Sequence, residues 1–150
     1  MQVSQKSQYT LRALFELAKR QGGEPATVAE IADAQAIPRR FLELIFLDLR
    51  SRGLIESRRG SQGGYVLTAS PETITVGDII RAIDGSLSPV KCLVGRSEEH
   101  CRLRNRCVFL SVWQRAQKAM EEVYDNTTLQ DLIDDERTAA QESGPLVHVA

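Results

Sequence analysis

The chain has 150 residues, of which 42% are hydrophobic, and a formal net charge of −1. It suits one domain with a modest core, and it is not an evenly basic nucleic-acid binder. The first ten residues contain no apolar region of the signal-peptide type, and no apolar run approaches the roughly 18–20 residues of a membrane span. We therefore expect a cytoplasmic protein that does not enter a membrane.

The first part of the chain predicts a helix-turn-helix unit. The stretch SQYTLRALFELAKRQGG places its apolar side chains on one helical face and ends in two glycines. Thr27 opens a second, short helix with the capping-box spacing to Glu30. Pro38 stands where a third helix can begin, and Gly53 ends that helix. Two short helices, a tight turn and a third helix are typical of helix-turn-helix proteins.

A short hairpin is predicted directly after the third helix. Residues 54–57 and 65–68 are strand-like runs, and the sequence RRGSQGG between them forms a glycine-rich tip with two arginines. A hairpin in this position is the wing of a winged helix. Its Arg58, Arg59 and Gln62 are placed to reach phosphates or the minor groove while the third helix enters the major groove.

The stretch from residue 39 to residue 59 is basic, with six arginines against three acidic residues. A solvated surface is the alternative interpretation of such a stretch. Arginine can read guanine edges and glutamate can accept from cytosine, whereas Leu44 and Leu47 leave thymine contact and packing both open. Seven residues of the third helix and the wing are predicted to contact DNA: Arg39, Arg40, Glu43, Arg58, Arg59, Gln62 and Tyr65.

Two further helices are predicted on either side of the cysteines. Thr75, with Asp78 three residues later, caps one helix, and Gly85 ends it. The next helix carries apolar residues with the alternating spacing of a heptad seam. We predict that this seam joins two copies of the chain, although packing on the chain's own domain remains the alternative. The predicted seam consists of Phe109, Trp113, Met120 and Val123, with Ala116 between them.

A last short helix is predicted to begin at residues 126–128 and to be followed by a polar, flexible tail. The chain is thus divided into four parts. They are a winged helix-turn-helix DNA-binding domain over residues 1–85, a cysteine segment over 86–107, a dimerisation helix with a short terminal helix over 108–136, and a tail over 137–150.

All three cysteines of the chain lie close together in the sequence, at Cys92, Cys101 and Cys107. An odd number of thiols argues against a disulfide framework, and the absence of a C-x2-C pair argues against a zinc finger. Charged neighbours argue against a buried apolar setting, which leaves soft-metal ligation or thiol redox chemistry. The interleaved arginines would offset the negative charge of an iron–sulfur cluster. Zinc bound by three cysteines and His100 stays open.

Five features together resemble the Rrf2 family of bacterial transcription regulators, and within it the iron–sulfur cluster biogenesis (IscR-like) regulators most. These are SQYTLRALFELA, RFLELIFLDLRSRGLIESRRGSQGGYVL, ITVGDIIRAIDG, the three cysteines and TTLQDLID. The resemblance spans residues 1–136 and implies a winged-helix homodimer on double-stranded operator DNA. It also implies an iron–sulfur cluster held by the three cysteines, and it places Arg59 in the wing and Glu43 on the base-reading face.

The chain departs from that resemblance at the fourth cluster ligand. IscR-like members have a histidine where this chain has Leu110, and related redox sensors use an acidic residue of the partner's first helix where this chain has Gln8. The first two cysteines are also more widely spaced. His100 and Gln8 of the partner chain are therefore both candidates for the fourth ligand, and we favour a 2Fe–2S cluster over a 4Fe–4S cluster.

The sequence thus predicts a mostly α fold with a small β-wing, in which a winged helix-turn-helix domain precedes a long dimerisation helix. The predicted function is that of a homodimeric DNA-binding regulator, a repressor, whose operator affinity depends on an iron–sulfur cluster. One alternative is a cluster-free Rrf2-type regulator of cysteine metabolism. A thiol or metal oxidoreductase is the other, and we expect no enzyme because the sequence lacks a catalytic triad, a phosphate loop and a C-x-x-C motif.

Overall fold

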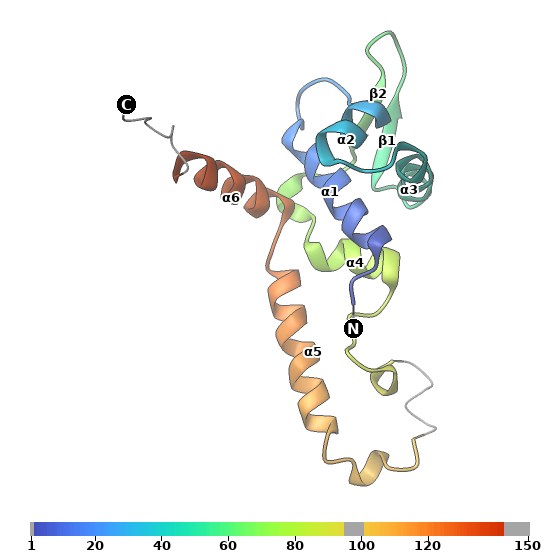
Figure 1. Cartoon of the computed structure of the whole chain (residues 1–150), viewed down its shortest axis with the longest axis vertical. Coiled ribbons are helices and arrows are strands. Elements are labelled where there is room, and N and C mark those ends of the chain that lie inside the picture. Colours follow the sequence, from blue (N-terminus) through green and yellow to red (C-terminus); the bar gives the residue numbers. More distant parts are fainter. Residues whose placement is uncertain (1, 95–100, 143–150) are drawn as a thin grey trace, which may run out of the picture.

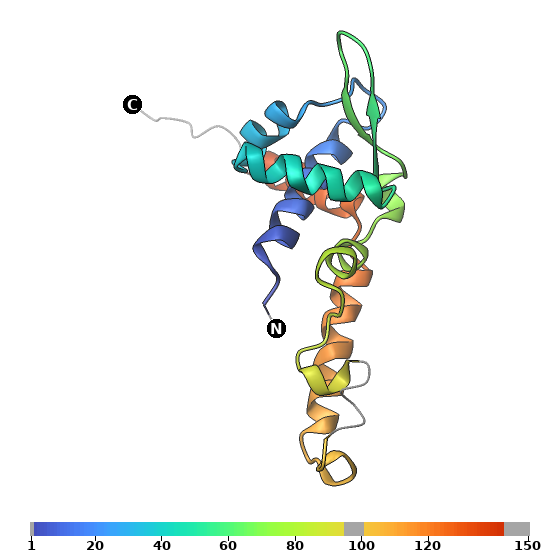
Figure 2. The same cartoon turned by 90° about the vertical axis from the view of Figure 1, so that its right-hand side faces the viewer.

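The computed structural model describes residues 2–94 and 101–142. A helical body occupies one end, and α5 (Leu110–Asp125) leaves it as a long arm (Figure 1). Two short 3-10 turns, η2 (Lys91–Leu93) and η4 (Arg104–Arg106), precede α5, and η4 lies at the far end of the arm in both views (Figures 1 and 2). The turn that contains Cys92 thus lies beside the arm, and the turn that ends at Cys107 lies at its far end.

Three helices form the predicted helix-turn-helix unit: α1 (Gln5–Lys19), α2 (Val28–Gln35) and α3 (Arg39–Ser51). The predicted capping box is confirmed, because the Thr27 side chain accepts from the Glu30 backbone N–H and the Glu30 carboxylate accepts from the Thr27 backbone N–H. Ala36 ends α2 in the left-handed region, with φ of 49°. This sharp turn brings Ile37 into the core, where it is 4% exposed, and α3 starts directly afterwards.

The wing is an antiparallel hairpin of β1 (Ile55–Arg58) and β2 (Gly64–Leu67). Both strands are displaced by one residue from the predicted positions. The loop before α2 joins this sheet, since the Ala26 and Tyr65 backbones exchange hydrogen bonds of 3.1 and 2.8 Å. A side chain at Gly64 would place its Cβ 2.5 Å from the carbonyl oxygen of Ala26, so the close approach requires glycine.

The core lies between α1, α3, the wing and α6 (Leu129–Glu142). Leu129 and Ile133 of α6 are 0% and 3% exposed, and α6 contacts α1 directly. The sequence pattern predicts that this helix belongs with the dimerisation helix and that a flexible tail begins at residue 137. Instead it packs on the DNA-binding domain and continues to Glu142, because its apolar face completes that core. The mostly α fold with a two-stranded wing is confirmed.

The arm is fixed to the body at α4 (Val76–Asp84). Arg81 of α4 donates two hydrogen bonds of 2.7 Å to the carboxylate of Asp125 at the end of α5. Gly77 lets the two helices meet, because a Cβ there would collide with the Asp125 side chain. The Val76 backbone N–H also donates to the carbonyl of Thr127, at 2.9 Å. The base of the arm is therefore held by both side chains and backbone.

Candidate nucleic-acid interface and cysteine segment

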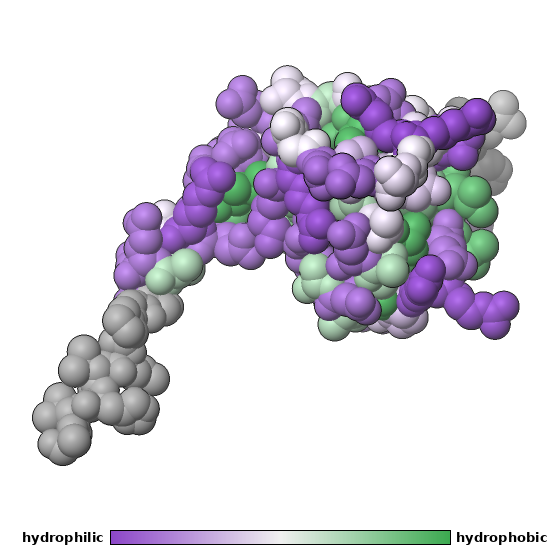
Figure 3. Space-filling view, turned by 90° about the horizontal axis from the view of Figure 1, so that it is seen from above, coloured by the Kyte–Doolittle hydropathy of each residue, from purple (hydrophilic) through white to green (hydrophobic). Residues whose placement is uncertain are grey.

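The third helix, α3, has one buried face and one exposed face. Four apolar residues on the inner face are at most 1% exposed: Leu42, Ile45, Phe46 and Leu49. Arg40, Glu43, Leu44 and Leu47 lie on the opposite face, and all are exposed. Seen from the wing end, the surface of the helical body is mostly hydrophilic, and hydrophobic surface lies toward the side of α3 (Figure 3). The outward face therefore combines charged and apolar groups.

Two of the predicted DNA-contacting arginines already have partners. Arg39 lies 3.6 Å from Glu43 and Arg58 lies 3.1 Å from Glu56, with all four side chains more than half exposed. Such exposed pairs contribute little free energy, so phosphates can replace the carboxylates. Arg40 and Arg59 are exposed and have no ion-pair partner among the described residues. Gln62 is exposed at the tip of the wing.

Tyr65, the seventh residue of the predicted DNA contact, is occupied inside the domain. Its ring packs edge-on against Phe46 with 4.8 Å between the ring centroids, and the residue is half-buried. Its backbone pairs with Ala26 as described above. The ring therefore joins the wing to the inner face of α3, and a contact of Tyr65 with DNA stays a prediction.

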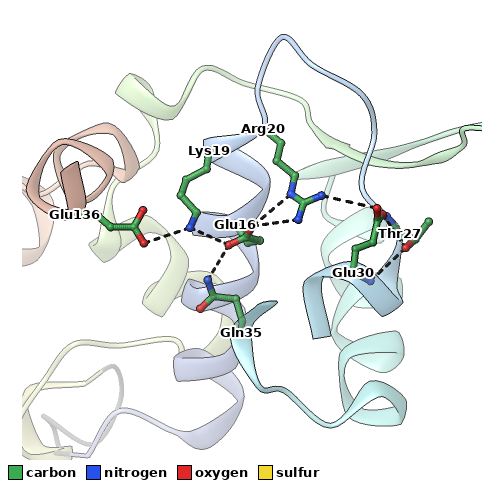
Figure 4. A network of polar contacts seen from close by, with 7 residues as sticks. All are labelled: Glu16, Lys19, Arg20, Thr27, Glu30, Gln35 and Glu136. Atoms are coloured by element: carbon green, nitrogen blue, oxygen red, sulfur yellow. Dashed lines mark hydrogen bonds and ion pairs between the residues drawn. The ribbon is translucent and has the colours of Figure 1, made fainter. Parts of the chain in front are cut away.

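A polar network ties the helices behind α3 together (Figure 4). The Glu16 carboxylate of α1, only 8% exposed, accepts from Gln35 of α2 at 2.9 Å and lies 3.2 Å from Arg20 and 3.1 Å from Lys19. Burial raises the pKa of Glu16, but the hydrogen bonds from Gln35 and Lys19 outweigh burial and leave the pKa below its ordinary value. Lys19 also contacts Glu136 of α6, at 3.2 Å. The network thus links α1, α2 and α6.

The arm helix α5 has no buried residue in the single chain. Trp113 and Met120 are half-buried, whereas Val112 is 48% and Val123 63% exposed. A shallow hollow on the exposed side is lined by residues that include Val112, Ala116 and Ala119. We call four residues along this side of the helix the α5 stripe, in which Ala116 is half-buried and the others are exposed: Val112, Ala116, Ala119 and Val123. Phe109, which is 60% exposed, precedes it. The predicted seam thus lies partly on the stripe and partly at its edge.

The three cysteines are free thiols, of which Cys92 lies in the turn beside the arm and Cys107 ends the turn at its far end (Figures 1 and 2). Cys92 lies in η2 and Cys107 ends η4, and both are half-buried, whereas Cys101 is exposed. No group of three His, Cys, Asp or Glu side chains is placed to hold a metal ion within residues 2–94 and 101–142. His100, one candidate for the fourth ligand, lies outside the described residues.

Of the other two positions considered for a fourth ligand, one holds an apolar side chain and the other holds an amide that already makes a hydrogen bond within its own chain. Leu110 is the first residue of α5 and offers no donor atom. The side-chain amide of Gln8 donates to the carbonyl of Val3 at 3.0 Å, and the residue is exposed on α1. Its amide oxygen is the atom that a metal could use, and amide oxygen is a hard ligand for iron.

The sequence did not reveal how the beginning of α1 joins α4. The Ser4 backbone N–H donates to the Asp84 carboxylate at 3.0 Å, and the Ser4 hydroxyl bonds the same group. Burial raises the pKa of Asp84, yet these hydrogen bonds leave it lowered overall. Residues 80 apart in the chain carry no local signal of such a contact.

In the described part of the chain, none of the helices has the length and apolar character needed to cross a membrane.

Comparison with known proteins identifies clear relatives. Residues 3–135 match the Rrf2 family, described as iron-dependent transcriptional regulators. The HTH-type transcriptional regulator CymR of Bacillus subtilis is 40% identical over 132 residues, covering 88% of this chain and 89% of CymR. IscR of Yersinia pseudotuberculosis is 31% identical over 136 residues, covering 91% of this chain and 81% of IscR.

Solved structures give the same relatives. B. subtilis CymR, described as the global cysteine regulator, matches with a TM-score of 0.73 at 39% identity, covering 88% of this chain and 95% of CymR. T. potens IscR matches with a TM-score of 0.72 at 36% identity, covering 93% of this chain and 90% of IscR. These relatives are transcription regulators and not enzymes, as the sequence predicted.

Proposed function

Because the chain belongs to the Rrf2 family of transcriptional regulators, we propose that it is a cytoplasmic repressor that binds operator DNA as a homodimer. We further propose that an iron–sulfur cluster at Cys92, Cys101 and Cys107 controls its affinity for the operator. The observation that carries the proposal is the combination of an exposed, partly basic α3 face and wing with three free thiols in the one segment that precedes α5.

In this proposal α3 enters the major groove and the wing contacts the backbone beside it. Arg40 and Glu43 face the base edges, where arginine reads guanine and glutamate accepts from cytosine. Arg59, at the wing, neutralises a phosphate. The opposite face of α3 is fully buried, so the helix is held rigidly while it reads DNA.

The chemistry of the donor set fits an iron–sulfur cluster. Thiolate is the ligand of such clusters, and every thiol of the chain lies in this one segment. Arg102 and Arg106, both exposed beside the cysteines, would offset the negative charge of a thiolate-bound cluster. When bound, the cluster supplies a redox-sensitive group that joins the three cysteines. We favour the 2Fe–2S type, with His100 or Gln8 of the partner subunit as the fourth ligand.

The cysteine segment can affect DNA binding because it lies between α4 and α5 in the chain. Arg81 fixes α5 to α4 through Asp125, and Ser4 fixes the beginning of α1 to Asp84 at the end of α4. A cluster that joins the three cysteines would therefore bias the tilt of the arm relative to the helix-turn-helix unit. A coupling of about 1–3 kcal/mol between cluster and operator is enough to change occupancy.

The α5 stripe supports the homodimer. Its spacing of 4, 3 and 4 residues is that of a heptad seam, and the two alanines let a second helix approach closely. An antiparallel pairing centred between Ala116 and Ala119 places Arg115 beside Glu122 of the partner subunit, twice by symmetry. Both charged side chains are exposed and line the hollow on α5. Trp113 and Met120 then flank the other side of the seam.

A cluster-free regulator of cysteine metabolism is the second candidate. Two observations favour it: among the described residues, the cysteines do not converge with other ligands, and the chain is 40% identical to CymR. In that case the thiols would respond to oxidation or serve no regulatory purpose, and control would come from another protein.

Anaerobic purification separates the two candidates. The cluster proposal predicts visible absorbance together with iron and sulfide bound to the chain, all lost in Cys101→Ser because oxygen is a poorer ligand for the cluster. Leu103→Ser is the matched control, since Leu103 is exposed in the same segment. Iron-free protein that binds the operator with the affinity of Cys101→Ser would support the cluster-free candidate instead.

A further inference from the structure

The outward face of α3 carries two exposed leucines. Leu44 is 63% and Leu47 62% exposed, and within residues 2–93 no other large hydrophobic side chain is exposed. The domain buries its other leucines and isoleucines well, so these two are not excess apolar residues that failed to find a core. Apolar side chains rimmed by charge on an otherwise polar surface mark a contact site.

The position of the two leucines coincides with the proposed base-reading surface. With about 100° per residue, Leu44 and Leu47 share one face with Arg40 and Glu43, directly opposite the buried face. They are separated by about 4.5 Å along the helix axis, which is comparable to the base-pair rise of about 3.4 Å. Two such side chains can therefore face the same or neighbouring base pairs.

We propose that Leu44 and Leu47 read the C5-methyl groups of thymines in the major groove, an inference that rests on the DNA-binding function proposed above. The thymine methyl is the apolar group on the major-groove base edges, and an apolar side chain suits it. Leucine facing the amino group of cytosine or adenine would instead exclude water from a donor without replacing the hydrogen bond. Arg40 lies on the same face as the two leucines, and its positive charge suits the negatively charged DNA backbone better than an apolar protein partner.

The test begins with selection of a half-site from random duplex DNA by the full-length protein. Each thymine of the selected site is then replaced by deoxyuridine, which removes only the methyl group, and Kd is measured by fluorescence anisotropy at fixed salt. Loss of one methyl contact should weaken binding about fourfold, which corresponds to about 0.8 kcal/mol per buried carbon. Replacement in both half-sites should weaken binding about fifteenfold.

The variants assign each contact. Leu44→Ala should remove the sensitivity to deoxyuridine at one thymine and Leu47→Ala at another, while Glu43→Ala leaves both sensitivities in place. If the protein selects a sequence but no thymine is sensitive, the methyl-reading inference is wrong and DNA binding survives. Failure to enrich any duplex would overturn both the inference and the proposed function. Unchanged DNA affinity in Leu44→Ala with loss of binding to another protein would assign the face to that protein.

Discussion

Reversing one charge beside the α5 stripe should weaken the dimer, and reversing both should restore it. In the antiparallel pairing, Arg115 of one subunit meets Glu122 of the partner subunit at two symmetric places. Arg115→Glu or Glu122→Arg alone turns both attractive pairs into repulsive ones. The double variant Arg115→Glu/Glu122→Arg exchanges the charges and recovers the attraction, whereas a parallel pairing would bring neither pair together.

The size of the effect follows from the two pairs. An exposed ion pair contributes about 0.2–1 kcal/mol, and like charges destabilise by a similar amount. Each reversal therefore costs about 0.4–2 kcal/mol per pair and about 0.8–4 kcal/mol per dimer. The dissociation constant of the dimer should rise roughly 4-fold to 1000-fold. The effect should shrink at about 1 M salt, where the Debye length is about 3 Å.

Sedimentation equilibrium at low and high salt measures this dissociation constant. Gln114→Glu is the matched control, because it adds a negative charge at an exposed position of α5 that does not line the hollow. Circular dichroism shows whether each variant is folded. The antiparallel seam is refuted if the single reversals associate like the wild type, or if the double variant is weaker than either single variant.

Three further predictions concern the DNA contact, the core and the base of the arm. Arg59→Ala removes one proposed phosphate contact from each subunit, so it should reduce the slope of log K against log salt by about 1.8 for the dimer on operator DNA, or about 0.9 per subunit. An unchanged slope would remove Arg59 from the contact. Leu129→Ala should lower the free energy of unfolding by about 2–5 kcal/mol in urea titrations, and a much smaller loss would contradict the packing of α6 in the core. Hydrogen bonds from Arg81 lower the pKa of Asp125 in the folded protein. Their contribution to stability is therefore fully present above the pKa of an unfolded aspartate, about 3.9, and it is lost as pH falls through the lower pKa of the folded state. Arg81→Gln should therefore lower Tm relative to the wild type at pH 7 and differ less from it at pH 2.

Local signals in the sequence predicted the DNA-binding domain well. The capping boxes at Thr27 and Thr75 are both formed, because each depends only on residues three positions apart. The glycine-rich tip likewise predicted the hairpin, with an error of one residue at each strand. The Rrf2 assignment and the mostly α fold with a small wing are confirmed.

Contacts between distant residues could not be predicted in this way. The return of Leu129 and Ile133 to the core was missed, because a short amphipathic helix does not specify which surface it covers. The apolar residues of α5 fit two neighbouring heptad registers, and only their exposure distinguishes Val112 and Ala119 from Trp113. The spacing of the cysteines along the sequence does not show which other side chain comes near them in space, so the fourth ligand could not be predicted from that spacing.

Operator affinity of the same protein with and without its cluster is the most direct test of the account. Anaerobically purified wild type and Cys92→Ser should be titrated with the selected operator and with unrelated duplex DNA, with iron content measured on each sample. We predict that cluster loss changes operator Kd by about 5- to 150-fold with little change on unrelated DNA. Equal operator Kd for iron-loaded wild type and iron-free Cys92→Ser would contradict control by the cluster.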